Sequence, residues 1–162
     1  MMDFEKLLRL LTKSKVEFII VGGAAATVHG ASRLTQDLDV VYGRTPGNLR
    51  RLVSALAKVK PALRGAPRGL PFRLGVETLE RGLNFTLSTS LGDLDLLGEI
   101  VGGGRYDQLL PDCIKIRVFG VECLCLGLDR LITVKRASGR PRDLETVAEL
   151  EALRSETGRK RR

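Results

Sequence analysis

The amino-acid sequence predicts a single α+β domain, and three observations lead to this fold class. The chain has 162 residues, which suits one compact domain with a substantial buried core. Short apolar runs typical of strands alternate with longer segments in which apolar residues recur at helical spacing. Neither an internal repeat nor a linker splits the interior of the chain. We therefore expect one folded unit over residues 1–156 and a basic tail over residues 157–162.

The first part of the chain reads as helix, strand, glycine turn, short helix and strand. Apolar residues three and four positions apart in residues 4–11 predict an amphipathic helix with Asp3 as its N-cap. The β-branched run over residues 16–21 predicts a buried strand, and Gly22-Gly23 ends it. A short helix should follow, before a second strand over residues 37–42.

Helices and paired strands alternate in the rest of the chain. Thr45 as N-cap and Pro46 at the first helical position predict another helix. Residues 61–75 are rich in proline and glycine and read as a loop. The remaining expected elements are strands over residues 83–89 and 93–97, a short helix near residues 106–110, a hairpin of residues 114–118 and 121–126, and helices over residues 128–137 and 144–153.

The charge balance favours an anionic partner. Lysine and arginine total 27 against 19 acids, so the formal net charge is +8 and the surface attracts a nucleotide, a nucleic acid or an acidic protein. Arg64, Arg68 and Arg73 make the loop at residues 61–75 basic. The terminal run at residues 159–162 is read as a solvated tail in preference to a binding arm.

The cysteines and the hydropathy pattern indicate a cytoplasmic protein. Cys113, Cys123 and Cys125 are odd in number and lack the spacing of a disulfide framework, as in a reducing compartment. The chain has one histidine, so buried apolar cysteines are expected in place of a zinc site. No run approaches the roughly 18 apolar residues of a membrane span, and the acidic start lacks a signal-peptide pattern.

Gly22-Gly23 and Asp37-Leu38-Asp39 form the central motif of the sequence. Side chains alternate along a strand, so Asp37 and Asp39 point to the same face. Two adjacent carboxylates repel each other unless a cation lies between them, and oxygen ligands alone favour Mg²⁺ or Mn²⁺. The glycines leave backbone N–H groups open to a phosphate. A tight turn and a common strand-end pair would explain each half separately, but together they predict a nucleoside triphosphate site.

A third carboxylate is expected because two-metal phosphoryl transfer needs a group that positions the attacking hydroxyl and takes its proton. Asp93 and Asp95 are the candidates, again with same-face spacing. Asp93 follows Gly92 and fits a turn-capping acid, whereas Asp95 lies inside an apolar strand, where an unpartnered carboxylate is costly. We favour Asp95, with Asp93 as its rival and Glu99 as a third choice.

Three stretches of the sequence resemble the DNA polymerase beta-type nucleotidyltransferase superfamily, and in particular its small bacterial and archaeal members, which include toxin–antitoxin proteins. The resemblance covers roughly residues 16–153. Arg142 stands where a lysine is usual in this family. The matching stretches are Gly22-Gly23 with Ser32-Arg33-Leu34-Thr35-Gln36 and Asp37-Leu38-Asp39; Gly92-Asp93-Leu94-Asp95-Leu96-Leu97; and Leu131-Ile132-Thr133-Val134-Lys135 with Arg140-Pro141-Arg142-Asp143-Leu144.

The resemblance implies a nucleotidyltransferase fold, with a mixed β-sheet flanked by helices. It also implies two Mg²⁺ ions, or Mn²⁺ in their place, and an NTP substrate, with ATP as the first choice. A nucleoside monophosphate would pass to an acceptor hydroxyl with release of pyrophosphate. By position, the metal-binding and catalytic residues would be Asp37, Asp39 and Asp95, and the nucleotide-binding residues would be Gly22, Gly23, Arg33, Thr35, Lys135 and Arg140.

Structural roles are open for several of these residues. Arg33 fits a solvent-facing loop cation, and Lys135 and Arg140 fit cations that serve a helix dipole. Asp143 is interpreted as the N-cap of the final helix, and His29 as a packed or capping histidine and not a base.

Several functions remain open on the sequence alone. The acceptor would be RNA or tRNA, which the basic charge slightly favours, a partner protein or a small molecule. A non-catalytic nucleotide-binding or protein-interaction module of a two-component, toxin–antitoxin-like pair is the alternative. A sugar transferase that holds a nucleotide sugar through Asp-x-Asp would need a longer chain. The sequence does not predict an oligomeric state.

Overall fold

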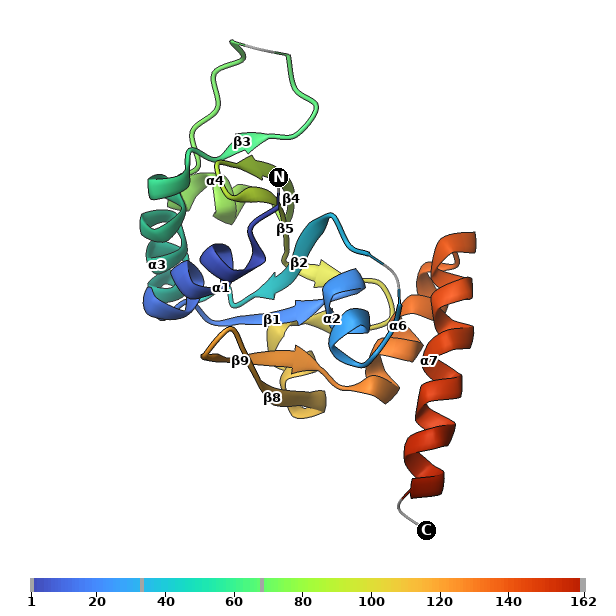
Figure 1. Cartoon of the computed structure of the whole chain (residues 1–162). Coiled ribbons are helices and arrows are strands. Elements are labelled where there is room, and N and C mark those ends of the chain that lie inside the picture. The colour runs from blue at the N-terminus through green and yellow to red at the C-terminus, as the bar shows by residue number, and fades with distance from the viewer. Residues whose placement is uncertain (1, 33, 68, 161–162) are drawn as a thin grey trace.

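The computed structural model describes residues 2–32, 34–67 and 69–160. Its centre is a seven-stranded mixed sheet with helices on both sides, which confirms the predicted α+β class (Figure 1). Two neighbouring pairs are parallel, β1 with β9 and β2 with β5, and the others are antiparallel. Across the sheet the strands are β3 (Ala62–Leu63), β4 (Asn84–Thr89), β5 (Gly92–Leu97), β2 (Asp37–Tyr42), β1 (Phe18–Val21), β9 (Val121–Leu126) and β8 (Cys113–Val118).

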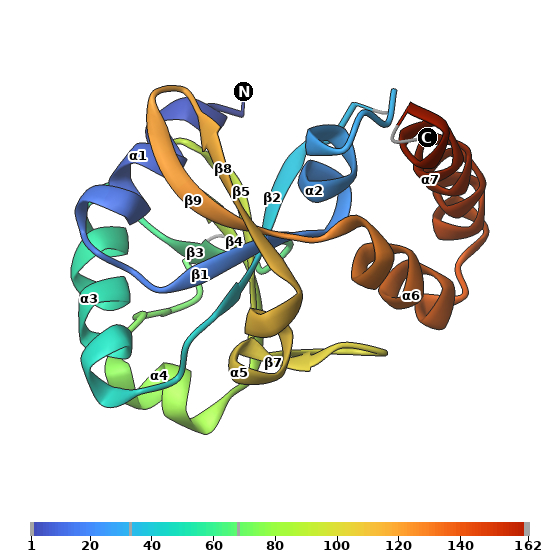
Figure 2. The same cartoon turned by 90° about the horizontal axis from the view of Figure 1, so that it is seen from below.

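The helices form two groups, one on each side of the sheet (Figure 2). On one side lie α1 (Phe4–Lys13), α3 (Pro46–Leu56) and α4 (Val76–Arg81). On the other side lie α2 (Gly22–Val28), α6 (Leu128–Ser138) and α7 (Pro141–Lys160). The smaller elements are α5 (Tyr106–Leu109), the 3₁₀ turns η1 (Ala57–Val59) and η2 (Leu110–Asp112), and a ribbon of β6 (Glu99–Ile100) with β7 (Gly104–Arg105).

Local sequence signals account for the beginnings of two helices. The Asp3 carboxylate accepts a hydrogen bond from the Lys6 N–H at 3.0 Å and caps α1 as expected. The Thr45 hydroxyl accepts one from the Asn48 N–H at 3.3 Å, with Pro46 at the first position of α3. The Asn48 side chain is fully buried and donates to the carbonyl oxygens of Glu17 and Gly43, so this polar group costs little to bury.

The core is built from alternate residues of the central strands. Leu38 in β2 and Leu94 in β5 are fully buried. Their sequence neighbours Asp37 and Asp39 point to the opposite face, as strand geometry requires. Burial also explains the cysteines: Cys125 is fully buried and its thiol pKa is raised to about 12, so it stays protonated and unreactive.

The structure differs from the sequence expectations at four elements, α2, β3, α4 and α7. The helix α2 begins on Gly22 and Gly23 themselves, not after them. The residue 61–75 segment contributes the short strand β3, because its first residues pair with β4, and α4 follows where no helix was expected. The last helix runs from Pro141 to Lys160 and is longer at both ends than the apolar spacing indicated. No helix in the described ranges is long and apolar enough to cross a membrane.

Candidate active site

The pairing of β2 with β5 places four carboxylates on one face of the sheet. The two strands are parallel, with Asp37 opposite Asp93 and Asp39 opposite Asp95. The intervening leucines point to the other face and are buried there. The sequence predicted the same-face spacing within each strand, but only the pairing shows that the two Asp-x-Asp segments are neighbours.

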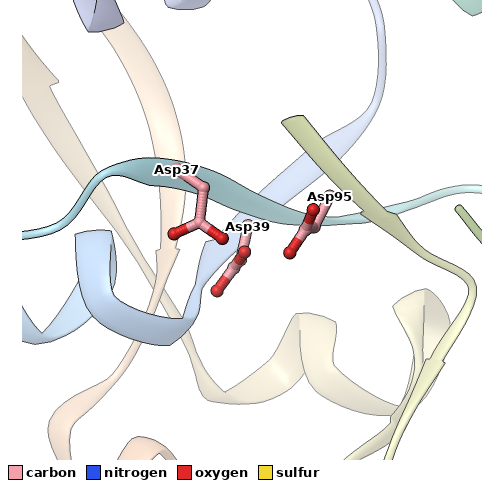
Figure 3. A group of neighbouring side chains, drawn as sticks. All are labelled: Asp37, Asp39 and Asp95. Atoms are coloured by element: carbon pink, nitrogen blue, oxygen red, sulfur yellow. The ribbon is translucent and has the colours of Figure 1, made fainter. Parts of the chain in front are cut away.

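Three of these carboxylates converge closely. One oxygen each from Asp37, Asp39 and Asp95 can be chosen so that all three lie within 4.8 Å of one another, and Figure 3 shows the side chains pointing into one space. Asp93 lies beside this group but outside that distance, which supports Asp95 as the third carboxylate. Glu99 lies in the separate β6–β7 ribbon, within 3.9 Å of Arg105, and does not line the site.

The electrostatics of the group call for a cation. Burial, followed by the charges of Asp37 and Asp95, raises the pKa of Asp39 to about 8. Burial and the Asp95 charge also raise the pKa of Asp37. The Asp39 Oδ1 atom is buried and has no hydrogen-bond partner among the described residues. Mg²⁺ and Mn²⁺ prefer carboxylate oxygens as ligands, and a bound cation would stabilise the ionised form of these carboxyl groups. These residues therefore fit a divalent ion.

Gly22 can lie close to the carboxylates because it has no side chain. Its φ of +64° belongs to the left-handed region, and a Cβ there would lie 2.1 Å from Asp39 Oδ2. Gly23 approaches Thr35, whose Oγ1 would be 3.0 Å from an added Cβ. The Thr35 hydroxyl donates to the Asp37 carbonyl at 2.9 Å and so ties the preceding loop to the start of β2. The two glycines therefore allow the backbone to approach the carboxylates closely.

A second, basic part of the site comes from α6 and α7. The Lys135 ammonium is buried and lies 3.4 Å from Asp143 Oδ1, while Arg140 Nε donates to Asp143 Oδ2 at 2.7 Å. Burial alone would raise the pKa of Asp143, but hydrogen bonds from Ser138 and Arg140 and the nearby cations lower it below its usual value. Asp143 therefore stays ionised and holds the two cations in place.

The expectation that Asp143 caps the final helix is wrong. The helix α7 already begins at Pro141, and the Asp143 side chain turns to the cations of the preceding segment instead of to the helix N–H groups. Lys135 and Arg140 each contact this carboxylate and line the same cavity. His29 lies apart, with its Nε2 2.8 Å from the Leu126 carbonyl oxygen, in agreement with a packing role.

The carboxylates, the glycines and the cations line one cavity of about 440 Å³. The lining of this cavity therefore carries both carboxylates and cations. Arg33 lies outside the described residues, and the sequence expectation for it stays a prediction. The described residues that line the cavity are Gly22, Gly23, Ala26, Leu34, Thr35, Gln36, Asp37, Asp39, Arg64, Asp93, Asp95, Lys135, Arg140, Arg142, Asp143 and Thr146.

Arg64 is the residue of the site that the sequence did not single out. It follows β3 and extends its guanidinium to the carboxylates, with Nη2 2.8 Å from Asp95 Oδ1 and Nε 3.3 Å from Asp93 Oδ2. In the sequence it was one of several cations in a loop, with no local pattern to distinguish it. Its place depends on the pairing of β3 with β4, a contact between distant segments.

The raised pKa of Asp39 predicts how stability depends on pH when no metal is bound. The folded state keeps this proton up to about pH 8, whereas the unfolded chain releases it near pH 3.9. Between these values the folded state binds more protons, so the free energy of unfolding should fall as pH rises, by up to about 1.4 kcal/mol per pH unit. Urea denaturation in EDTA at pH 5, 6 and 7 measures this slope. Asp39→Asn should flatten it, and an unchanged slope in that variant would contradict the assignment.

The buried pair of Lys135 and Asp143 should matter for stability. Asp143→Asn leaves the ammonium buried without its counter-charge and should lower the free energy of unfolding by about 1–3 kcal/mol, measured by urea denaturation. Asp112→Asn is the matched control, because its ion pair with Arg130 at 3.7 Å is much more exposed than the Lys135–Asp143 pair and should contribute under about 1 kcal/mol. Equal losses in the two variants would show that burial of the pair is unimportant.

Comparison with known structures identifies the fold. No protein-family model matches the chain, and no curated protein matches it in sequence. It is similar to the lincomycin-bound crystal structure of the lincosamide antibiotic adenylyltransferase LnuA, with a TM-score of 0.62 and 13% identity over 93% of this chain and 96% of that chain. It is also similar to ANT(2")-Ia in complex with adenylyl-2"-tobramycin, with a TM-score of 0.53 and 13% identity over 97% of this chain and 95% of that chain. The chain therefore has a nucleotidyltransferase fold, as the sequence resemblance implied.

Proposed function

We propose that this protein transfers a nucleoside monophosphate from an NTP to an acceptor hydroxyl, with a divalent metal ion and release of pyrophosphate. The observation that carries the proposal is the convergence of Asp37, Asp39 and Asp95 on adjacent strands of a nucleotidyltransferase fold. The cavity that they line is also lined by the cations Lys135 and Arg140. A metal–triphosphate complex carries both signs of charge, so the carboxylates could hold its metal ion and the cations its phosphates.

Each part of the chain has a defined role in this proposal. Asp37, Asp39 and Asp95 would hold Mg²⁺ or Mn²⁺, which supplies charge neutralisation and Lewis acidity at the phosphates. The acceptor oxygen forms a bond to the α-phosphorus, the bond from that phosphorus to the pyrophosphate oxygen breaks, and the hydroxyl proton passes to Asp95. Lys135 and Arg140 would offset the negative charge that grows on the leaving pyrophosphate.

The acceptor is proposed as a class defined by its hydroxyl. RNA or tRNA and a partner protein follow from the basic charge and from the sequence resemblance to small, toxin–antitoxin-type members. A small molecule is supported by the structural neighbours, one of which is bound to lincomycin and another to adenylyl-2"-tobramycin. ATP is the nucleotide we would test first.

A label-transfer assay tests the proposal. The protein is incubated with Mg²⁺ and each α-³²P-labelled NTP, with total RNA, cell lysate, or a panel of lincosamides and aminoglycosides as acceptor. Label should enter one acceptor class and should be lost in Asp37→Ala and Asp95→Ala, while Asp129→Ala, an exposed acid on α6, should retain it. NTP binding without transfer to any acceptor would contradict catalysis, and absence of NTP binding with metal would contradict the site itself.

A second candidate is a non-catalytic nucleotide-binding or interaction module. One observation favours it: the guanidinium of Arg64 already lies against the carboxylates where a metal would bind. The three converging carboxylates repel one another, which costs folding free energy, and a bound metal ion would offset this cost. This arrangement favours the catalytic proposal.

A further inference from the structure

The Arg64 guanidinium lies close to three carboxylates of the site and not to one alone. Its Nη2 lies 2.8 Å from Asp95 Oδ1, its Nε 3.3 Å from Asp93 Oδ2 and its Nη1 4.0 Å from Asp37 Oδ2. The same Nη2 also donates to the Leu87 carbonyl at 2.8 Å. One guanidinium thus spans three carboxylates contributed by β2 and β5.

We propose that Arg64 is a displaceable positioning residue: its guanidinium holds the carboxylates of Asp37 and Asp95 together before metal binds, and leaves them when a divalent ion takes its place. The inference rests on the proposed metal-dependent function. It adds a competition between a side chain and the metal for the same carboxylates.

The two cations compete for the same carboxylates. A guanidinium stays protonated in proteins and offers only N–H donors, so it cannot become a metal ligand. A divalent ion held by Asp37 and Asp95 would lie within a few ångströms of the guanidinium and repel it. Binding of the metal and the contacts of Arg64 with these carboxylates therefore weaken each other.

The backbone at Arg64 is arranged so that the side chain can move alone. The Arg64 N–H donates to the Thr86 carbonyl at 3.0 Å, and the two preceding residues pair with β4. The side chain is 29% exposed, so it has a path to solvent without unfolding of the strand. Beyond Arg64 the described parts of the segment that leads to α4 project from the body of the protein (Figure 1).

This competition favours entry of metal together with nucleotide. When free metal binds, the Arg64 guanidinium loses its ion pairs with the carboxylates and gains no new anionic partner, which makes binding less favourable. A metal–triphosphate complex brings phosphate oxygens, with which arginine pairs strongly, into the same cavity. Arg64 would then exchange one set of anions for another at the rim of the site.

Direct measurement of Mn²⁺ binding tests the inference without any acceptor or turnover. Isothermal titration of the nucleotide-free protein would compare the wild type with Arg64→Met, Arg64→Lys and Arg73→Met. Arg73 is the matched control, because it is an exposed arginine of the same segment and its replacement changes the net charge equally. Arg64→Met should bind Mn²⁺ about tenfold more tightly, while its metal-free melting temperature falls by several degrees. Arg64→Lys should lie between, and Arg73→Met should match the wild type.

The outcomes separate this inference from the proposed function. Mn²⁺ binding that is unchanged or weaker in Arg64→Met overturns the inference alone, since the metal site then exists without competition. Binding seen only in Arg64→Met would make Arg64 a permanent occupant of the nucleotide-free site and overturn its displacement by free metal. Binding in neither protein would overturn the competition, and the label-transfer assay with metal and NTP decides the proposed function separately. If Arg64→Met does not fold, Arg64→Lys decides: tighter binding with a lower melting temperature supports the inference, and wild-type affinity overturns it.

Discussion

Asp39→Asn should abolish nucleotidyl transfer and at the same time stabilise the metal-free protein. The amide keeps the size of the side chain but removes a negative ligand, so the transfer rate should fall by roughly 1000-fold or more. Yet the carboxylate is buried and repelled by Asp37 and Asp95, and its pKa is raised for these reasons. At pH 7 the folded, metal-free protein must keep Asp39 protonated, whereas the unfolded chain releases this proton. An amide removes that cost, so the melting temperature in EDTA should rise.

Opposite changes in activity and stability distinguish a functional carboxylate from a structural one. The assay of label transfer and a thermal melt in EDTA, on the same preparation, give both quantities. Asp112→Asn is again the control, since loss of its partly exposed ion pair should leave activity and melting temperature nearly unchanged. A variant at Asp39 that lost stability together with activity would show that the carboxylate supports the fold and would weaken the metal site.

Gly22→Ala should have the second largest effect, because two separate penalties act at this position. The φ of +64° costs an alanine about 1–2 kcal/mol, and its Cβ would lie 2.1 Å from the Asp39 Oδ2 atom. The carboxylate must therefore move away from its position. Displacement of a reacting group by about 1 Å can cost roughly 100-fold in rate, so we expect a loss of transfer of that order or more.

Gly139→Ala separates the two penalties. Gly139 ends α6 with a φ of +67°, but nothing lies within 4 Å of its missing Cβ. Its replacement should cost a similar free energy of unfolding, by urea denaturation, and leave transfer intact at temperatures where the protein is folded. Equal losses of activity in the two variants would mean that backbone strain alone, and not the clash with Asp39, explains the result.

Much of the fold could be read from the sequence because its signals are local. Caps such as Asp3 and Thr45, and the alternation of apolar and acidic residues in β2 and β5, depend on neighbours within a few positions. The carboxylates of the site were predictable for the same reason. Their mutual distance was not, because it depends on which strands pair.

What the sequence left out arises from long-range contacts. Arg64 comes to the site through the pairing of β3 with β4, and Asp143 acts through Lys135 and Arg140 across the turn between two helices. In the sequence Arg64 is one cation in a basic segment, and Asp143 resembles an N-cap. The chemical character of each residue was visible, but its partner was not.

The in-register pairing of β2 with β5 has a consequence for how the site tolerates change. Asp39 lies directly opposite Asp95, so the separation of their backbones is the interstrand spacing of any hydrogen-bonded sheet, about 4.8 Å. That length is a property of the peptide group and is independent of which side chains pack beneath the strands. Substitutions that repack the apolar layer at Leu38 or Leu94 would therefore alter the stability of the protein, while the backbone separation of Asp39 and Asp95 stays constant.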